Sequence, residues 1–294
     1  MGDSTQINLE QLDALTQINL NDLVSSFGWQ AQPVLARLLQ WIFHKPAQTF
    51  AKLMLEFDAA ISERGLVNAS CLIEKRFVRD VRVFGLDRVP DSAFLALSNH
   101  PGMTDSLSLF AALNHPALKI IALDRPFLMA LPNMSKRLFF VKDDPASRMA
   151  LVRQVSGHLR NGGAALTFPA GEIEPDPNVY SGAVDSLQTW TDSVGVFVRM
   201  APDTIILPVL VRNVIWDKTA KHPLLNKLKK TRDERERLAA AMQLLAMVMW
   251  NVKPVTVTVQ IGKPIDSKTL GTTSTQVIHQ SVLTEMKYLI ENPP

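Results

Sequence analysis

The chain has 294 residues, of which 47% are hydrophobic and 20% are charged. This length and composition are sufficient for a sizeable core and exclude wholesale disorder. The formal net charge of +3 does not indicate nucleic-acid binding, which needs a concentrated basic face. The single cysteine, Cys71, excludes an internal disulfide and favours a reducing compartment.

Residues 1–77 have the apolar spacing of helices. One helix is predicted over 34–43, and Pro46 is expected to occupy the first turn of another helix that runs through Phe50 and Phe57. The N-terminus lacks the basic and apolar regions of a secretory signal, and the apolar run Leu238–Trp250 is too short to span a bilayer. We therefore predict a cytoplasmic protein that associates with a membrane only peripherally.

From about residue 78 onward, short apolar runs alternate with helical stretches. The predicted strands are Val78–Phe84, Ala93–Leu97, Lys119–Leu123, Leu138–Val141, Ala164–Phe168, Ile205–Val211 and Val255–Ile261. The predicted helices between and after them are Asp105–Leu113, Pro145–Arg160, Ala183–Met200, Arg232–Trp250 and Val277–Ile290. This alternation predicts an N-terminal helical region over 1–77. An α/β domain is predicted over 78–294, with a mostly parallel mixed sheet of about seven strands flanked by helices. The ligand site of such a sheet usually lies beyond the carboxyl ends of its strands.

The strongest chemical signal is the segment that ends the second predicted strand. His100 follows the apolar run, residues 101–102 (Pro-Gly) predict a turn, and Thr104 is expected to cap a helix with Asp105 in its first turn. A neutral imidazole can take a proton from an attacking hydroxyl, and a carboxylate on its other nitrogen fixes its tautomer. The alternative is a histidine and a helix-start aspartate that never meet.

The other histidines give a contrast. Residues 114–116 repeat the letters Asn-His-Pro, but Ile120 stands five residues after His115, and we interpret this copy as a helix stop. The remaining histidines form no ligand cluster, so no metal site is predicted; they are His44, His158, His222 and His279.

Four segments then occur in a familiar order: 99–105 (NHPGMTD), 138–142 (LFFVK), 166–172 (LTFPAGE) and 206–210 (ILPVL). The set resembles the glycerolipid acyltransferase superfamily, whose members include lysophosphatidic-acid and glycerol-3-phosphate acyltransferases. The resemblance covers residues 80–265 or so. It implies that His100 and Asp105 are the catalytic pair.

The resemblance also implies substrate-binding residues, with departures from the family pattern. Lys142 stands where the family has an acceptor-binding arginine, which keeps the charge and loses the bidentate fork. Ala170 and Ile173 replace the usual glutamate and phosphate-binding arginine of the third segment. The other motif residues that we expect at the substrate are Asn99, Phe168, Pro169, Gly171, Glu172 and Pro208.

The altered third segment leaves the acceptor open. Gly171 allows a close backbone approach, so amides there are candidates for a phosphate or a developing oxyanion, and the alternative is a plain turn. The cations that could replace the missing arginine are Arg125, Arg137, Lys142 and Arg148. Each has the alternative of a solvated surface charge, and the acceptor has the alternative of bearing no phosphate.

Two surfaces are candidates for lipid contact. One combines leucines with basic residues and is either a membrane-facing patch or a solvated helix and loop; it comprises Lys221, Leu224, Leu225, Lys227, Leu228, Lys229, Lys230 and Arg232. The other is the set of N-terminal aromatic residues, for which a core position is the alternative; these are Trp29, Trp41, Phe43 and Phe50.

The predicted function is therefore O-acyl transfer from acyl-CoA or an acyl carrier protein to a glycerol-phosphate, lysophospholipid or related hydroxyl. No cofactor beyond the thioester co-substrate is expected, and the expected partners are the donor, the lipid acceptor and a membrane surface. One alternative is a thioester or ester hydrolase on the same site, although the chain has no G-x-S-x-G elbow. The other is a non-catalytic lipid-binding protein on an acyltransferase scaffold.

Overall fold

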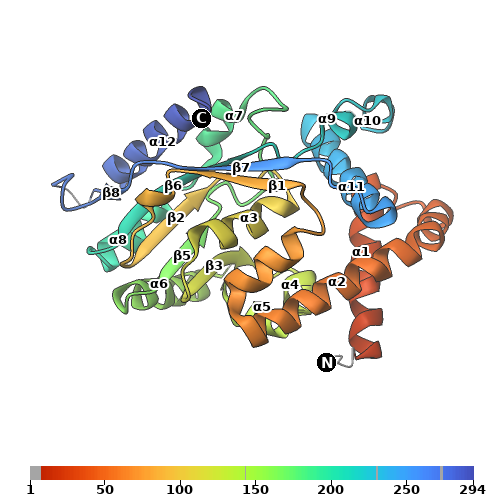
Figure 1. Ribbon diagram of the computed structural model, residues 1–294, viewed down its shortest axis with the longest axis horizontal. Helices are drawn as coiled ribbons and strands as arrows, with labels where there is room; N and C mark the ends of the chain where they lie inside the picture. Colours follow the sequence, from red (N-terminus) through yellow and green to blue (C-terminus); the bar gives the residue numbers. More distant parts are fainter. Residues whose placement is uncertain (1–7, 143, 230, 272–273) are drawn as a thin grey trace.

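The computed structural model describes residues 8–142, 144–229, 231–271 and 274–294. Its centre is a sheet of eight strands flanked by helices on both faces (Figure 1). The strands are β1 Asp80–Phe84, β2 Phe94–Ser98, β3 Leu118–Leu123, β4 Leu138–Val141, β5 Ala164–Thr167, β6 Ile205–Arg212, β7 Thr256–Ile261 and β8 Ile265–Asp266. All seven predicted strands are confirmed, and β8 is a short addition.

The strand order is β1-β7-β6-β2-β5-β3-β4, with β8 paired to β6. Every neighbouring pair is parallel except β6–β7 and β6–β8, which are antiparallel. The mostly parallel mixed sheet expected from the alternation of apolar runs is confirmed. The carboxyl ends of β2 and β5 meet at the centre of the sheet, because Leu97 pairs with Thr167.

Among the described residues, two helices precede the first strand, and the others lie between strands or after the last one. The helices are α1 Leu9–Phe27, α2 Pro33–Glu74, α3 Met103–Leu113, α4 Pro126–Met129, α5 Pro132–Ser135, α6 Pro145–Arg160, α7 Ala183–Ser186, α8 Ser193–Met200, α9 Asp217–Ala220, α10 Pro223–Leu228, α11 Arg232–Trp250 and α12 Thr275–Glu291, with short 3-10 turns η1 Leu86–Arg88 and η2 Leu187–Thr189. No helix in the described part of the chain is long and apolar enough to cross a membrane.

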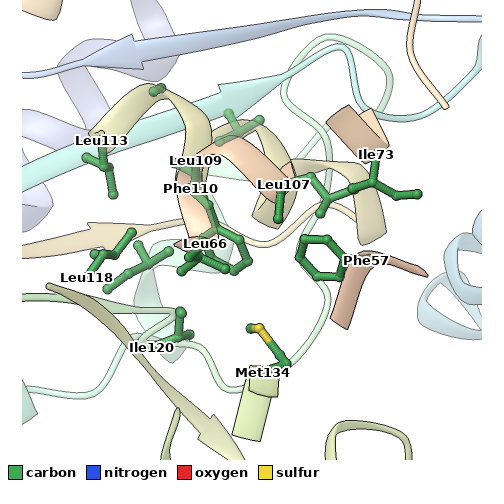
Figure 2. Packing of buried hydrophobic residues seen from close by; sticks show 14 of the residues in the cluster. Phe57, Leu66, Ile73, Leu107, Leu109, Phe110, Leu113, Leu118, Ile120 and Met134 are labelled. Carbon is green, nitrogen blue, oxygen red and sulfur yellow. The ribbon is translucent and has the colours of Figure 1, made fainter. Parts of the chain in front are cut away.

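Alternate residues of the central strands enter two separate cores. Ala96 of β2 packs with α2, α3 and α5 on one face, whereas Leu95 and Leu97 pack with α6, α8 and α12 on the other. Figure 2 shows the first core, in which Phe57 of α2, Phe110 of α3 and Met134 of α5 surround a common centre. The full burial of β2 explains its uninterrupted apolar sequence, which is typical of parallel strands covered on both faces.

Two helix predictions are wrong in detail. Pro46 lies inside α2 and does not begin a helix; the break comes at Gly65, whose φ of 78° and ψ of 164° are outside the helical region. The predicted helix Ala183–Met200 is divided into α7, η2 and α8. It is interrupted at Trp190, which adopts an extended backbone conformation at the end of η2.

Candidate active site

The turn between β2 and α3 brings the His100 and Asp105 side chains together. His100 Nδ1 lies 2.9 Å from Asp105 Oδ2. The same oxygen accepts the Gly102 amide at 2.9 Å, and Oδ1 accepts the Ser106 hydroxyl at 3.0 Å. Asp105 is fully buried, so three donors fix its carboxylate. Thr104 is not the helix cap as expected; Gly102 occupies that position, and the Asp105 carboxylate binds its amide.

The residues around His100 raise the pKa of its imidazole. Burial alone lowers the pKa of His100, but the charge and hydrogen bond of Asp105, together with Glu174, raise it above its ordinary value. The Phe168 ring lies 4.6 Å from the imidazole, centre to centre. Nε2 has no hydrogen bond to any described residue, and the side chain is 30% exposed. A proton on Nδ1, bound to Asp105, therefore leaves Nε2 free to act as a base.

A large cavity begins at this imidazole. Its volume is about 1150 Å³, and its wall includes His100 together with side chains from α2, α3, β3, α5, α6 and α11. Most lining residues are apolar, including Phe50 and Met54 of α2 and Phe110 of α3. The arrangement places one polar catalytic candidate on the wall of a mostly apolar space, which is the usual composition of a ligand pocket.

The third motif segment forms a turn on the cavity wall. The Gly171 amide donates to the Phe168 carbonyl at 3.0 Å. Gly171 adopts a φ of 69°, with open space where a Cβ would be, so the glycine is required by its backbone conformation. The Gly171 amide is engaged within the turn, and a role of other amides in this segment toward a phosphate or an oxyanion stays a prediction. Phe168, Pro169 and Glu172 all line the cavity.

Charged groups on the cavity wall differ partly from those predicted. Arg125 and Arg148 line it as expected, and Arg237 of α11 joins them. Arg237 Nη2 lies 3.7 Å from Glu172 Oε2. The predicted set missed Arg237 because its helix is distant in sequence from the motif segments.

Four predicted substrate-binding residues lie elsewhere. The Asn99 amide group bonds both the N–H and the C=O of Val211 at 2.8 and 2.9 Å, so it extends the pairing of β2 with β6. Arg137 precedes β4 at its amino end and donates to the Pro116 carbonyl at 3.1 Å. Because substrate would approach the opposite strand ends, the structure does not bring Arg137 to His100.

Lys142 and Pro208 are also outside the cavity wall. Lys142 directly follows β4 at the carboxyl edge of the sheet, beside Val141, which does line the cavity. Pro208 lies inside β6 opposite Leu97. Its missing N–H falls between the ladders to β7 and β8, where the Pro208 carbonyl accepts the Gly262 amide at 2.8 Å. Pro208 therefore lies within the sheet, and a contact with substrate stays a prediction.

Comparisons with known proteins find likeness only among solved structures. No protein-family model matches the chain, and no curated protein matches it. Among solved structures, it is similar to the 1-acyl-sn-glycerophosphate (LPA) acyltransferase PlsC from Thermotoga maritima, with 17% sequence identity and a TM-score of 0.46. The similarity covers 93% of this chain and 97% of that chain.

Sequence reasoning did not predict the burial or the contacts of two carboxylates that follow the third motif. Glu174 accepts the His100 amide at 3.3 Å and the Trp190 indole N–H at 2.7 Å. Burial raises its pKa to about 7, although these hydrogen bonds oppose the shift. Asp176 accepts the amides of Val214 and Ile215 after β6 at 2.6 and 3.0 Å. The only signal in the sequence is the run 174–177 (Glu-Pro-Asp-Pro) after the motif.

The second Asn-His-Pro segment has a structural role. α3 ends at Leu113, and Asn114 adopts a left-handed conformation with a φ of 41°. His115 Nδ1 accepts the Ala117 amide at 3.2 Å, and its ring packs edge-on against Phe94 at 5.6 Å. The interpretation of this copy as a helix stop is confirmed.

The basic and leucine-rich segment around α10 is largely paired. Lys221 lies 2.7 Å from Asp217, Arg232 lies 2.7 Å from Glu236, and Lys229 is buried. Leu225 is buried, while Leu224 and Leu228 are exposed; Lys230 lies outside the described residues.

The N-terminal aromatic residues divide into two groups. Phe50 is buried in the core, and Trp29 and Phe43 pack against a smaller cluster. Trp41 is 79% exposed. It shares the outer face of α2 with four further exposed apolar residues, Val34, Leu35, Leu38 and Ile42.

Proposed function

We propose that this chain is an O-acyltransferase that moves a fatty acyl group from a thioester to a glycerol-type hydroxyl. The observation that carries the proposal is the His100 imidazole, bound through Nδ1 to buried Asp105, at the wall of a large apolar cavity. The four ordered motifs that resemble the glycerolipid acyltransferase superfamily support the same reaction. Acyl-CoA or an acyl carrier protein is the donor, and a glycerol-phosphate, lysophospholipid or related hydroxyl is the acceptor.

The chemical step needs a base and no cofactor beyond the thioester. The acceptor oxygen attacks the thioester carbonyl carbon while its proton passes to His100 Nε2. The new C–O bond forms, the tetrahedral intermediate collapses, and the C–S bond breaks. The departing thiolate takes the proton back from the imidazolium, whose charge the Asp105 carboxylate stabilises in the meantime. No covalent acyl-enzyme is formed.

The size and lining of the cavity support a lipid substrate. Its volume of about 1150 Å³ exceeds the roughly 300–1,000 Å³ usual for small-ligand pockets. Long acyl chains need such an apolar space, because each buried methylene group contributes about 0.8 kcal/mol to binding. Arg125 and Arg237 at the wall are the groups proposed to receive an acidic acceptor headgroup.

Peripheral membrane association is part of the proposal. The exposed apolar face of α2 carries Trp41, a residue type that favours the membrane interface. Leu224 and Leu228 of α10 are also exposed. A lipid acceptor would reach the cavity most readily from a bilayer that such residues contact.

The distribution of a labelled acyl group tests the reaction type. Purified protein is given a labelled long-chain acyl-CoA alone, then with glycerol 3-phosphate, and then with a lysophospholipid. The proposal predicts label in an acylated acceptor that depends on adding that acceptor. Release of free fatty acid at the same rate in all three mixtures would show a hydrolase, and label that stays bound but unreacted would show a lipid-binding protein.

A further inference from the structure

Glu174 is a buried carboxylate that contacts the main chain of His100 at two points. Its Oε2 accepts the His100 amide at 3.3 Å, and its own amide donates to the His100 carbonyl at 2.9 Å. Glu174 is 3% exposed and lies 74 positions from His100 in the sequence. The backbone of the proposed base is therefore held on both sides by one residue of a distant loop.

The other carboxylate oxygen of Glu174 is fixed from a third part of the chain. Oε1 accepts the Trp190 indole N–H at 2.7 Å and the Ser186 hydroxyl at 3.2 Å. The Ser186 hydroxyl also lies 2.9 Å from the Ala183 carbonyl and has one hydrogen to share, but the His100 amide and the Trp190 indole N–H each donate to a different oxygen of Glu174. An amide would have to turn its NH₂ group toward one of these two donors. A carboxylate is thus the side chain that satisfies all of these contacts.

Burying a carboxylate at this depth is unfavourable in free energy, and a connection between loops alone does not require a carboxylate. Burial disfavours its charge, and a neutral hydrogen-bonding residue would avoid that cost. The charged form is favoured where it faces a group that becomes positive, and the Glu174 charge does raise the pKa of His100.

We infer that Glu174 is a positioning residue for His100: it fixes the main chain from which the imidazole extends, while Asp105 fixes the ring, so that Nε2 faces the cavity. The inference rests on the proposed function, in which Nε2 is the base. It assigns Glu174 no contact with substrate. Displacement of a reacting group by about 1 Å can lower a rate about 10²-fold, so the loss of this support has a measurable consequence.

The test compares Glu174→Gln with wild type in two measurements. The first is the titration of the His100 imidazole by NMR in protein labelled at histidine, with His100→Ala identifying the resonance. The second is kcat and KM for acyl transfer from pH 6 to pH 9 or so. We expect the pKa of His100 to fall because a nearby negative charge is lost. We expect kcat to fall about 10- to 100-fold with a nearly unchanged donor KM.

A matched control separates positioning from general destabilisation. Asp58 is likewise buried and accepts two main-chain amides and one side-chain amide at α5. Asp58→Asn should lower the melting temperature without changing the His100 titration. Trp190→Phe is a milder variant that removes only the indole donor. It should change the pKa of His100 in the same direction as Glu174→Gln does and lower kcat about fivefold.

The inference is overturned if folded Glu174→Gln has the kcat and the His100 titration of wild type. If Glu174→Gln does not fold, the same result in folded Trp190→Phe overturns it. An equal His100 shift in Asp58→Asn would also overturn it. The NMR titration needs no turnover. If wild-type protein transfers no acyl group, the proposed function fails, and the titration still decides whether Glu174 acts on the His100 imidazole.

Discussion

Replacing Asp105 with asparagine changes the charge beside His100 with little change in shape. In wild type, Asp105 Oδ2 receives both the Gly102 amide and His100 Nδ1, each at 2.9 Å. An asparagine oxygen in that position keeps both contacts. Its NH₂ group then takes the Oδ1 position, where the Ser106 hydroxyl, 3.0 Å from Oδ1, can rotate and accept. We therefore expect Asp105→Asn to fold with His100 still protonated on Nδ1.

The expected loss of rate follows from the charge alone. Two unit charges about 4 Å apart interact by about 4 kcal/mol at an effective dielectric constant of about 20. The imidazolium forms only as the proton is transferred, so most of this energy is missing from the transition state of the variant. Because the His100 side chain is 30% exposed, solvent screening reduces it, and a loss of about 3 kcal/mol corresponds to about a 10²-fold lower kcat.

The assay is the initial rate of acyl transfer at saturating donor and acceptor, compared with wild type and with Asp58→Asn. Asp58→Asn changes another buried carboxylate to an amide, in α2, where Asp58 accepts the Met134 amide of α5. The pKa of His100 should fall in Asp105→Asn and stay unchanged in Asp58→Asn. A folded Asp105→Asn protein with a rate within twofold of wild type would refute the reasoning. A loss near 10⁴-fold would mean that the amide has turned and reversed the tautomer.

Three further predictions address stability and the acceptor. The pKa of Glu174 rises from 4.5 to about 7 on folding, so its contribution to stability is full below pH 4.5 and is lost as the pH rises through 7. In urea unfolding, the stability of Glu174→Gln relative to wild type should therefore increase by about 2–3 kcal/mol between about pH 5 and pH 8. A difference in stability that stays constant over this pH range would contradict the prediction. Phe57→Ala should lower the free energy of unfolding by about 3 kcal/mol, the low end of the usual range, because the Phe57 side chain already borders the cavity; a loss under about 1 kcal/mol would show that the residue is not packed as described. Arg125→Gln should raise KM about fivefold for a phosphate-bearing acceptor, as expected for an exposed ion pair of about 1 kcal/mol; an equal change with a phosphate-free acceptor would remove Arg125 from headgroup binding.

The parts of the site that were predictable from the sequence are local. An apolar run that must be buried on both faces, followed by Pro-Gly and a helix start, places His100 and Asp105 at one tight turn. Backbone sterics decide this geometry within a few residues. The sequence around His115 likewise predicted a helix end, and Ile120 stands there where a carboxylate would be needed.

The parts that could not be predicted depend on contacts between distant segments. Glu174 reaches both His100 and Trp190, and Trp190 interrupts a stretch whose apolar spacing alone predicts one continuous helix. Arg237 enters the cavity wall from α11, whereas Arg137, nearer the motifs in sequence, lies at the wrong end of its strand. Tertiary packing decides these placements, and a pattern within a single segment does not contain that information.

The division at residue 77 remains a prediction. α2 packs on α3, and its buried side chains share a core with the sheet.

Within α2, Pro46 does not end the helix and Gly65 interrupts it. A proline in the sequence was therefore a weaker guide to the break than the conformational freedom of a glycine.

The central claim is that one histidine, and not its sequence copy, removes the proton from the acceptor hydroxyl. The most direct measurement is acyl transfer by His100→Ala beside His115→Ala, with circular dichroism and thermal melts to show that both are folded. His100→Ala should lose at least about 10³-fold of the transfer rate, and folded His115→Ala should keep a rate near that of wild type. Equal rates in the two variants would contradict the account.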